Sequence, residues 1–93
     1  MNTLAHIKQT ITPILLKNGI QKAGLFGSVA RGESSPNDVD ILVRIDHRIS
    51  LLRFIGIQQD LEDALGMKVD LVEYGALKPA LKSDILKEEV SVL

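Results

Sequence analysis

The stretch from Leu25 to Val43 constrains the fold more than any other part of the chain. It reads LFGSVARGESSPNDVDILV, in which an apolar segment runs into a Gly-Ser turn and a second apolar segment begins with Asp38 and Asp40. Side chains of a strand alternate between its two faces, so these aspartates share one face, roughly 7 Å apart. Their charges repel each other, and a hard divalent cation with oxygen ligands is the natural counter-charge.

The Gly27-Ser28 turn lies just before this pair of carboxylates. Its backbone N–H groups and the serine hydroxyl suit phosphate oxygens. Taken alone, a Gly-Ser turn is in most proteins only a turn, and an Asp-x-Asp at the start of a strand is more often a cap or a solvated pair. Their combination at this spacing, between two apolar strands, predicts a site for a metal ion and a nucleotide.

Size and composition exclude several classes of protein. The 93 residues predict one domain, 1–93, and the net charge of −1 argues against a large nucleic-acid-binding face. Aromatic residues make up 3%, too few for stacking platforms, and the absence of cysteine excludes disulfides and thiolate metal sites. No apolar run approaches the ~20 residues that span a bilayer, and the start of the chain does not resemble a signal peptide. We therefore expect a soluble, cytoplasmic protein that binds neither membranes nor nucleic acid directly.

Apolar spacing and turn residues predict the order helix, strand, strand, helix, strand, helix. The expected ranges are a helix at 4–18, a strand at 21–26, a helical turn at 28–32, a loop at 33–37, a strand at 38–45, a helix at 50–65, a strand at 67–73, a helix at 77–88 and an edge strand within 90–93. This order predicts an α/β (α+β) fold with a mixed β-sheet flanked by helices.

Three finer expectations concern the helices. Pro13 should kink the first helix or split it in two. The helix at 50–65 should bury one apolar stripe, and the charged residues of the last helix should form a solvated face. The stripe consists of Leu51, Phe54, Ile55, Leu61 and Leu65; the solvated face consists of Lys78, Lys82, Lys87, Asp84, Glu88 and Glu89. The two histidines, His6 and His47, lack nearby ligand partners at zinc spacing and should lie on the surface.

Asp70 provides a third carboxylate, within the expected strand at 67–73. It alternates with apolar neighbours, but spacing alone does not determine whether it shares a face with Asp38 and Asp40. Glu73 and Tyr74 follow just beyond this strand, where they can either contact a ligand or simply end the strand.

The pattern Gly27-Ser28-x-x-Arg31-Gly32, followed by Asp38-x-Asp40, resembles the signature of the DNA polymerase β-type nucleotidyltransferase superfamily. The small size resembles its minimal members, the MNT domains that are usually paired with HEPN-domain partners in bacterial and archaeal toxin–antitoxin operons. The resemblance implies a small nucleotidyltransferase fold over most of the chain. One departure is Asn37, which stands where Ser commonly precedes the first aspartate but can still hydrogen-bond the local backbone.

The resemblance also implies roles for the site residues. Asp38 and Asp40 would bind two Mg²⁺ ions, and Asp70 would assist the ion that activates the attacking hydroxyl or accept its proton. Gly27 and Ser28 would approach the phosphates of ATP. Arg31 would bind the β- and γ-phosphates, unless it forms a salt bridge with Glu33 instead.

The activity that the resemblance implies is transfer of AMP from ATP to a tyrosine of a HEPN ribonuclease toxin, within a hetero-oligomer. Anionic AMP groups near the ribonuclease site would block RNA entry. Two alternatives stay open. The chain could be a non-catalytic module that neutralises its partner by occlusion, or a free-standing transferase for a small molecule, which its short length disfavours.

Overall fold

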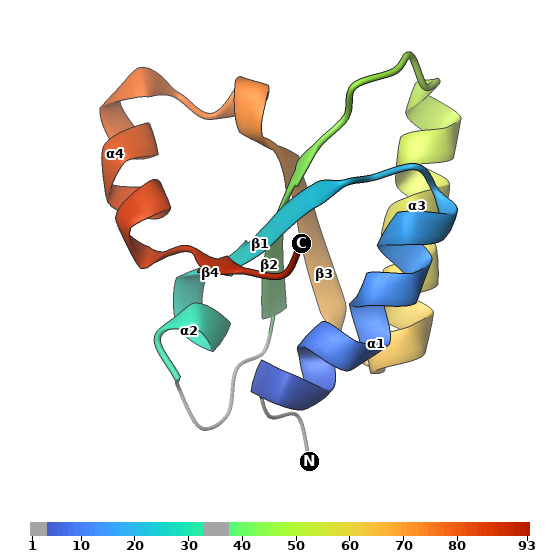
Figure 1. Cartoon of the computed structure of the whole chain (residues 1–93), viewed down its shortest axis with the longest axis horizontal. Helices are drawn as coiled ribbons and strands as arrows, with labels where there is room; N and C mark the ends of the chain where they lie inside the picture. The colour runs from blue at the N-terminus through green and yellow to red at the C-terminus, as the bar shows by residue number, and fades with distance from the viewer. Residues whose placement is uncertain (1–3, 33–37) are drawn as a thin grey trace.

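A four-stranded sheet with the order β3-β2-β1-β4 forms the centre of this computed structural model (Figure 1). The structure describes residues 4–32 and 38–93. β1 pairs antiparallel with both β2 and β4, whereas β2 pairs in parallel with β3. The sheet is therefore mixed, as the sequence predicts. The strands are β1 (Lys22–Phe26), β2 (Asp38–Arg44), β3 (Lys68–Glu73) and β4 (Val90–Ser91).

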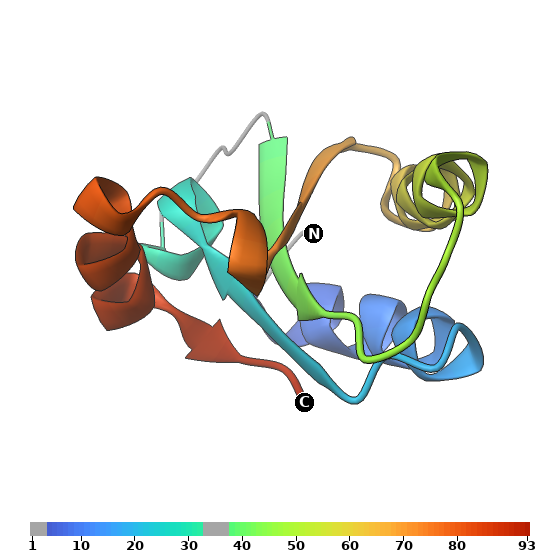
Figure 2. The ribbon, with the colours of Figure 1, turned by 90° about the horizontal axis from the view of Figure 1, so that it is seen from above.

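Helices lie on both sides of this sheet (Figures 1 and 2). Two of them, α1 and α3, lie side by side on one face, while α2 and α4 lie on the other side. The helices are α1 (Leu4–Lys17), α2 (Gly27–Ala30), α3 (Leu51–Leu65) and α4 (Pro79–Glu88), and a 3₁₀ turn, η1 (Tyr74–Ala76), follows β3.

Most of the hydrophobic core lies between the sheet and the pair α1 and α3, and Val29 of α2 also belongs to it. Every second residue of β1, β2 and β3 points into it, which is the alternation expected of strands with one apolar face. The buried cluster consists of Ile7, Ile11, Leu15, Ile20, Ala23, Leu25, Val29, Val39, Ile41, Val43, Ile57, Leu61, Leu65, Val69 and Leu71. Leu42, on the opposite face of β2, does not belong to this cluster.

Local signals determine where α3 begins and ends. The hydroxyl of Ser50 accepts a hydrogen bond from the Arg53 N–H at 3.1 Å, as an N-cap does. Gly66 ends the helix in the left-handed conformation at φ 66°, which favours glycine because it has no Cβ. α3 therefore begins and ends close to the predicted residues, and β3 follows it directly.

Two expectations about the helices need correction. Of the two alternatives for Pro13, the split is wrong, since this residue lies inside a single 14-residue helix, whereas the kink stays a prediction. In the predicted stripe of α3, Leu51 is 75% exposed and Ile55 41% exposed, while Ile57 is buried instead. The buried face of α3 therefore follows Ile57, Leu61 and Leu65, with Phe54 packed against it, and Leu51 and Ile55 lie outside this face. Within residues 4–32 and 38–93, no helix is long and apolar enough to cross a membrane.

Candidate functional site

The predicted carboxylates come together on neighbouring strands. Asp38 and Asp40 lie on β2, and Asp70 lies on β3, where it is the direct register partner of Asp40. Register partners in a parallel pair point to the same face, so all three aspartates share one face of the sheet. The register provides the placement of Asp70 that the spacing alone left open.

This face is the one opposite the core. Val39 and Ile41, which alternate with the aspartates, are completely buried against the helices, whereas Asp38 is exposed and Asp40 half-buried. Leu42, on the same face as the aspartates, is also completely buried, although it does not belong to the core cluster. Part of the carboxylate face is therefore covered, and the end that carries the aspartates is open.

Gly27 approaches Asp40 more closely than any other residue type could. The register pairs Phe26, the last residue of β1, with Asp40, and the chain then turns at Gly27 with φ 71°. A Cβ at this position would collide with the Asp40 carboxylate. Glycine is required here for both the backbone conformation and the close contact. No side chain caps the start of α2, so its first N–H groups remain available beside the carboxylates.

The surroundings of Asp40 disfavour the ionised form of its carboxyl group. Burial raises the pKa of its carboxyl above the ordinary value, and the charges of Asp70 and Asp38 raise that pKa further. Arg31 acts in the opposite direction and lowers it. The three carboxylates thus repel one another across the strand pair, and the Arg31 charge compensates only in part.

Arg31 follows α2, and its side chain turns toward α4. Its Nη1 lies 3.3 Å from Oε2 of Glu88, in an ion pair between two half-exposed side chains. The alternative partner Glu33 lies outside the described residues. Glu88 is exposed, as expected of a solvated face, and it also links α4 to Arg31 at the end of α2.

Glu89 differs from the expected solvated face, because its side chain is only partly exposed and is hydrogen-bonded. The Tyr74 hydroxyl donates a hydrogen bond to it, and its side chain lies against Gly24 of β1. Burial, followed by this hydrogen bond and the Glu89 charge, raises the pKa of Tyr74. Lys22 lies 5.5 Å from the centre of the Tyr74 ring. Glu89 lies against β1 and Tyr74 directly follows β3, so this hydrogen bond links elements on either side of β2. The one indication of this hydrogen bond in the sequence is Gly24, because a side chain at that position would collide with Glu89.

The donor set on this face suits a hard cation, since carboxylate oxygens are the ligands that Mg²⁺ prefers. The mutual repulsion around Asp40 is the condition that such a cation relieves. Among the described residues, however, no group of three or more His, Cys, Asp or Glu side chains is arranged to hold a metal ion by itself. Further oxygen ligands would have to come from a substrate, and the phosphates of a nucleotide are suited to this.

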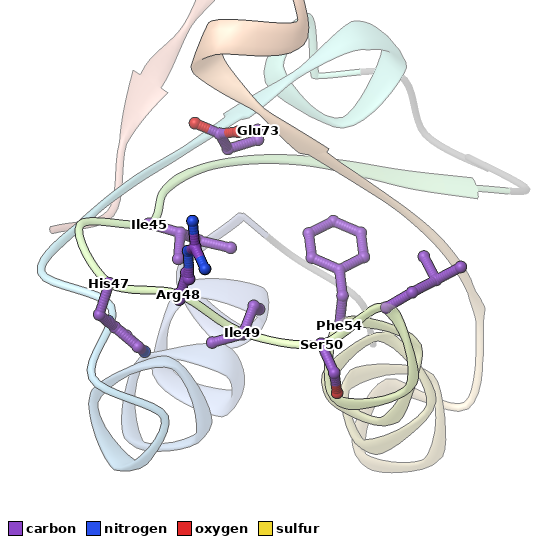
Figure 3. Close-up of a pocket in the computed structure, with 8 residues that line it drawn as sticks. Ile45, His47, Arg48, Ile49, Ser50, Phe54 and Glu73 are labelled. Atoms are coloured by element: carbon purple, nitrogen blue, oxygen red, sulfur yellow. The ribbon is translucent and has the colours of Figure 1, made fainter.

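A pocket of about 440 Å³ lies elsewhere, at the start of α3 (Figure 3). Ile45, directly after β2, and Glu73, the last residue of β3, belong to its wall, so it lies at the opposite end of these strands from Asp38. Its apolar lining includes Ile49 and Phe54. The sequence did not predict this pocket, and it is separate from the carboxylates.

Residues 9–93 match the protein family described as Polymerase beta, Nucleotidyltransferase. The chain is 46% identical over 89 residues to a protein of Methanocaldococcus jannaschii provisionally named a protein adenylyltransferase, covering 95% of this chain and 96% of that protein. It is 39% identical over 97 residues to the protein adenylyltransferase MntA of Thermococcus cleftensis, covering 99% and 98% respectively.

Two solved structures show the same fold. One, described as a toxin–antitoxin with AMP-PNP, superimposes with a TM-score of 0.80 at 26% identity and covers 92% of this chain and 72% of that chain. The other, provisionally described as a minimal nucleotidyltransferase, also gives a TM-score of 0.80, at 30% identity, and covers 96% of this chain and 95% of that chain. The small α/β architecture predicted from the sequence is thereby confirmed.

Proposed function

The chain belongs to the Polymerase beta nucleotidyltransferase family, and from this premise we propose that it is a protein adenylyltransferase antitoxin. It transfers AMP from ATP to a tyrosine of a partner HEPN ribonuclease toxin. The observation that carries this proposal is the register of Asp40 with Asp70, beside the close contact of Gly27 with Asp40. Similarity to relatives named as protein adenylyltransferases supports protein as the acceptor.

The reaction is an in-line displacement at the α-phosphorus of ATP. The tyrosine oxygen of the partner forms a bond to the α-phosphorus, the bond to the bridging oxygen of the β-phosphate breaks, and pyrophosphate leaves. The phenolic proton passes to a nearby base, for which Asp70 is placed on the open face next to Asp40.

Each site residue has a distinct task in this reaction. Asp38 and Asp40 would hold Mg²⁺ together with phosphate oxygens, and the bound metal would neutralise charge on the attacking and leaving oxygens. The N–H groups at Gly27 and Ser28 bind the phosphates where the chain comes closest to Asp40. Arg31, which lowers the pKa of Asp40, contributes positive charge toward the β- and γ-phosphates.

The acceptor must come from another chain. The only tyrosine here is Tyr74, and its hydroxyl is engaged by Glu89 with its pKa raised, so it is a poor nucleophile. The aspartates lie on the open end of their face, where a partner can approach them. One of the similar structures, described as a toxin–antitoxin with AMP-PNP, supports a partner and an adenine nucleotide.

Intact mass spectrometry of the co-purified partner, after incubation with ATP and Mg²⁺, tests the proposal. We expect the partner to gain whole AMP units and to lose ribonuclease activity. The matched sample carries Asp38→Asn and Asp40→Asn, which keep the size of the side chains but remove both charges, and it should show no gain. An unchanged partner mass and unchanged ribonuclease activity with the wild-type chain would refute the proposal.

A second candidate function is neutralisation of the partner by occlusion, without chemistry. The observation in its favour is that the aspartates lie at the open end of their face, where a partner can also bind without any reaction. The same double variant separates the two functions. Loss of neutralisation while the complex stays intact indicates chemistry, whereas full neutralisation by the variant indicates occlusion.

A further inference from the structure

Glu88 and Arg31 connect two elements that are far apart in the sequence. Arg31 follows α2 on the phosphate side of the site, and Glu88 is the last residue of α4. Their 3.3 Å contact joins a guanidinium nitrogen to a carboxylate oxygen, with 50% and 44% of the two side chains exposed. The pair therefore lies at the surface, at the entrance to the carboxylate face.

We propose that Glu88 competes with the triphosphate of ATP for Arg31 and thereby sets the affinity of the site for nucleotide. This inference rests on the proposed function, and it assigns to α4 a residue that determines nucleotide affinity. In the absence of ATP, the Glu88 carboxylate engages the guanidinium. When ATP binds, oxygens of the β- and γ-phosphates replace that carboxylate.

The exchange is chemically reasonable because carboxylates and phosphates make the same kind of charge-assisted hydrogen bond to guanidinium. Arg31 is also close enough to lower the pKa of Asp40, so one cation faces Glu88 on one side and the aspartates on the other. Glu88 adds a further negative charge beside a face that already carries Asp38, Asp40 and Asp70. An incoming polyanion must overcome this charge, and removal of Glu88 lessens it.

The size of the effect follows from the exposure of the pair. Ion pairs between half-exposed side chains are weak, and water and salt screen them. We therefore expect Glu88 to weaken nucleotide binding by about two- to fivefold. Such a contact adjusts the affinity and is easily displaced by ATP.

The test measures the binding of AMP-PNP with Mg²⁺ to the full chain by calorimetry. Glu88→Gln keeps the shape of the side chain and should tighten binding about two- to fivefold at low salt, with a smaller gain at high salt. The matched control is Asp84→Asn, which makes the same change of charge on the exposed surface of α4, one turn away. It should leave the affinity unchanged. In an Arg31→Ala background, Glu88→Gln should have no effect.

Each other outcome overturns the inference. Equal effects of Glu88→Gln and Asp84→Asn would indicate a general charge effect. Weaker binding by Glu88→Gln would mean that Glu88 orients Arg31 for the phosphates. An effect that persists without Arg31 would show that the ion pair is not involved. These three results leave the proposed function standing, whereas a wild-type chain that binds no AMP-PNP overturns the inference and the proposed function together.

Discussion

At the scale of single residues, the site depends on a glycine as much as on its aspartates. Gly27 combines a positive φ of 71° with a contact to Asp40 that leaves no room for a Cβ. Either requirement alone could be met by local adjustment. Together they join the Gly27-Ser28 turn to the strand that carries Asp40, so a change at Gly27 acts on Asp40 directly.

Gly27→Ala should therefore destabilise the fold more than the same change at Gly66. Both glycines have positive φ, but nothing lies within 4 Å of a Cβ added at Gly66. The backbone penalty, about 1–2 kcal/mol, is common to both variants. Urea unfolding followed by circular dichroism should show a larger loss for Gly27→Ala, and only this variant should impair AMP transfer. Equal losses with intact transfer would show that Asp40 moves aside freely.

Asp40 illustrates a conflict between stability and function at one side chain. Its pKa is raised in the folded state, so the folded chain holds the proton more strongly than the unfolded chain does. At neutral pH the ionised carboxylate thus disfavours folding. Asp40→Asn should raise the melting temperature at pH 7, and this gain should shrink as the pH falls toward the ordinary value of 3.8.

The same variant should lose activity. In the proposed function Asp40 is a metal ligand, and a bound metal contributes several kcal/mol to the transition state, so its loss should lower the rate of transfer about a hundredfold or more. Melting curves at several pH values and a pyrophosphate-release assay check both halves of this prediction. Asp84→Asn, with the same change of charge away from the site, controls for net charge. A variant less stable than wild type at pH 7 would contradict the electrostatic account.

At the scale of elements, the sequence predicts what depends on neighbours along the chain. The cap at Ser50, the stop at Gly66 and the alternation around Asp38 and Asp40 are local patterns, and the structure confirms them. The edge strand expected within 90–93 is also present, paired with β1. The order of helices and strands then restricts the sheet topologies that the chain can form.

The remaining features depend on contacts that no local pattern encodes. The face of Asp70 follows from its register with Asp40, which is determined only when β3 pairs with β2. Glu88, a partner of Arg31, is 57 residues away in the sequence. Leu51 is 75% exposed although it is apolar and its spacing fits the expected stripe, because the face of α3 that packs on the core is determined by the tertiary fold.

The hydrogen bond between Tyr74 and Glu89 links the end of β3 to the segment before β4. Its contribution to stability should depend on pH. Because the pKa of Tyr74 is raised above 10.0 in the folded state, its contribution to stability is present below that pH and is lost as the pH rises further. Tyr74→Phe should lower the free energy of unfolding at pH 7 by about 1–2 kcal/mol, since Glu89 loses its donor. It should also remove the part of the alkaline destabilisation that Tyr74 causes.

Unfolding by urea at pH 7 and above pH 10 checks this prediction, with the difference between the two chains isolating Tyr74 from the lysines. As the single tyrosine of the chain, it can also be titrated directly by its phenolate absorbance. A folded-state titration at the ordinary value would show that Glu89 does not hold the hydroxyl. The ring and its contact with Lys22 remain in Tyr74→Phe, so lost packing cannot explain the effect.

At the scale of the whole molecule, the two faces of the sheet differ in what they carry. One face supports the core through α1 and α3, and the other carries Asp38, Asp40 and Asp70. With 93 residues and a net charge of −1, the chain has no surplus of positive charge to balance these carboxylates. In the proposed function, a cation that relieves the repulsion among these carboxylates should therefore also stabilise the fold, which couples stability to ligand binding.

This coupling predicts that Mg²⁺ and nucleotide stabilise the chain cooperatively. Since no group of three potential ligands among the described residues is arranged for a metal, Mg²⁺ alone should shift the melting temperature little. The nucleotide alone should also shift it little, because its phosphates meet uncompensated carboxylates. Together, at about ten times their dissociation constant, they should add ~1.4 kcal/mol, or about 6–11 °C for a domain of this size.

Differential scanning fluorimetry with Mg²⁺, AMP-PNP or both measures these shifts. The Asp38→Asn and Asp40→Asn double variant should show no extra gain from the combination, because the carboxylates that hold the metal against the phosphates are gone. A full shift with Mg²⁺ alone would mean that the carboxylates close around the ion without nucleotide. Additive shifts would mean that metal and nucleotide occupy independent sites. Only a shift larger than the sum, lost in the double variant, fits one site in which the phosphates complete the metal's ligands.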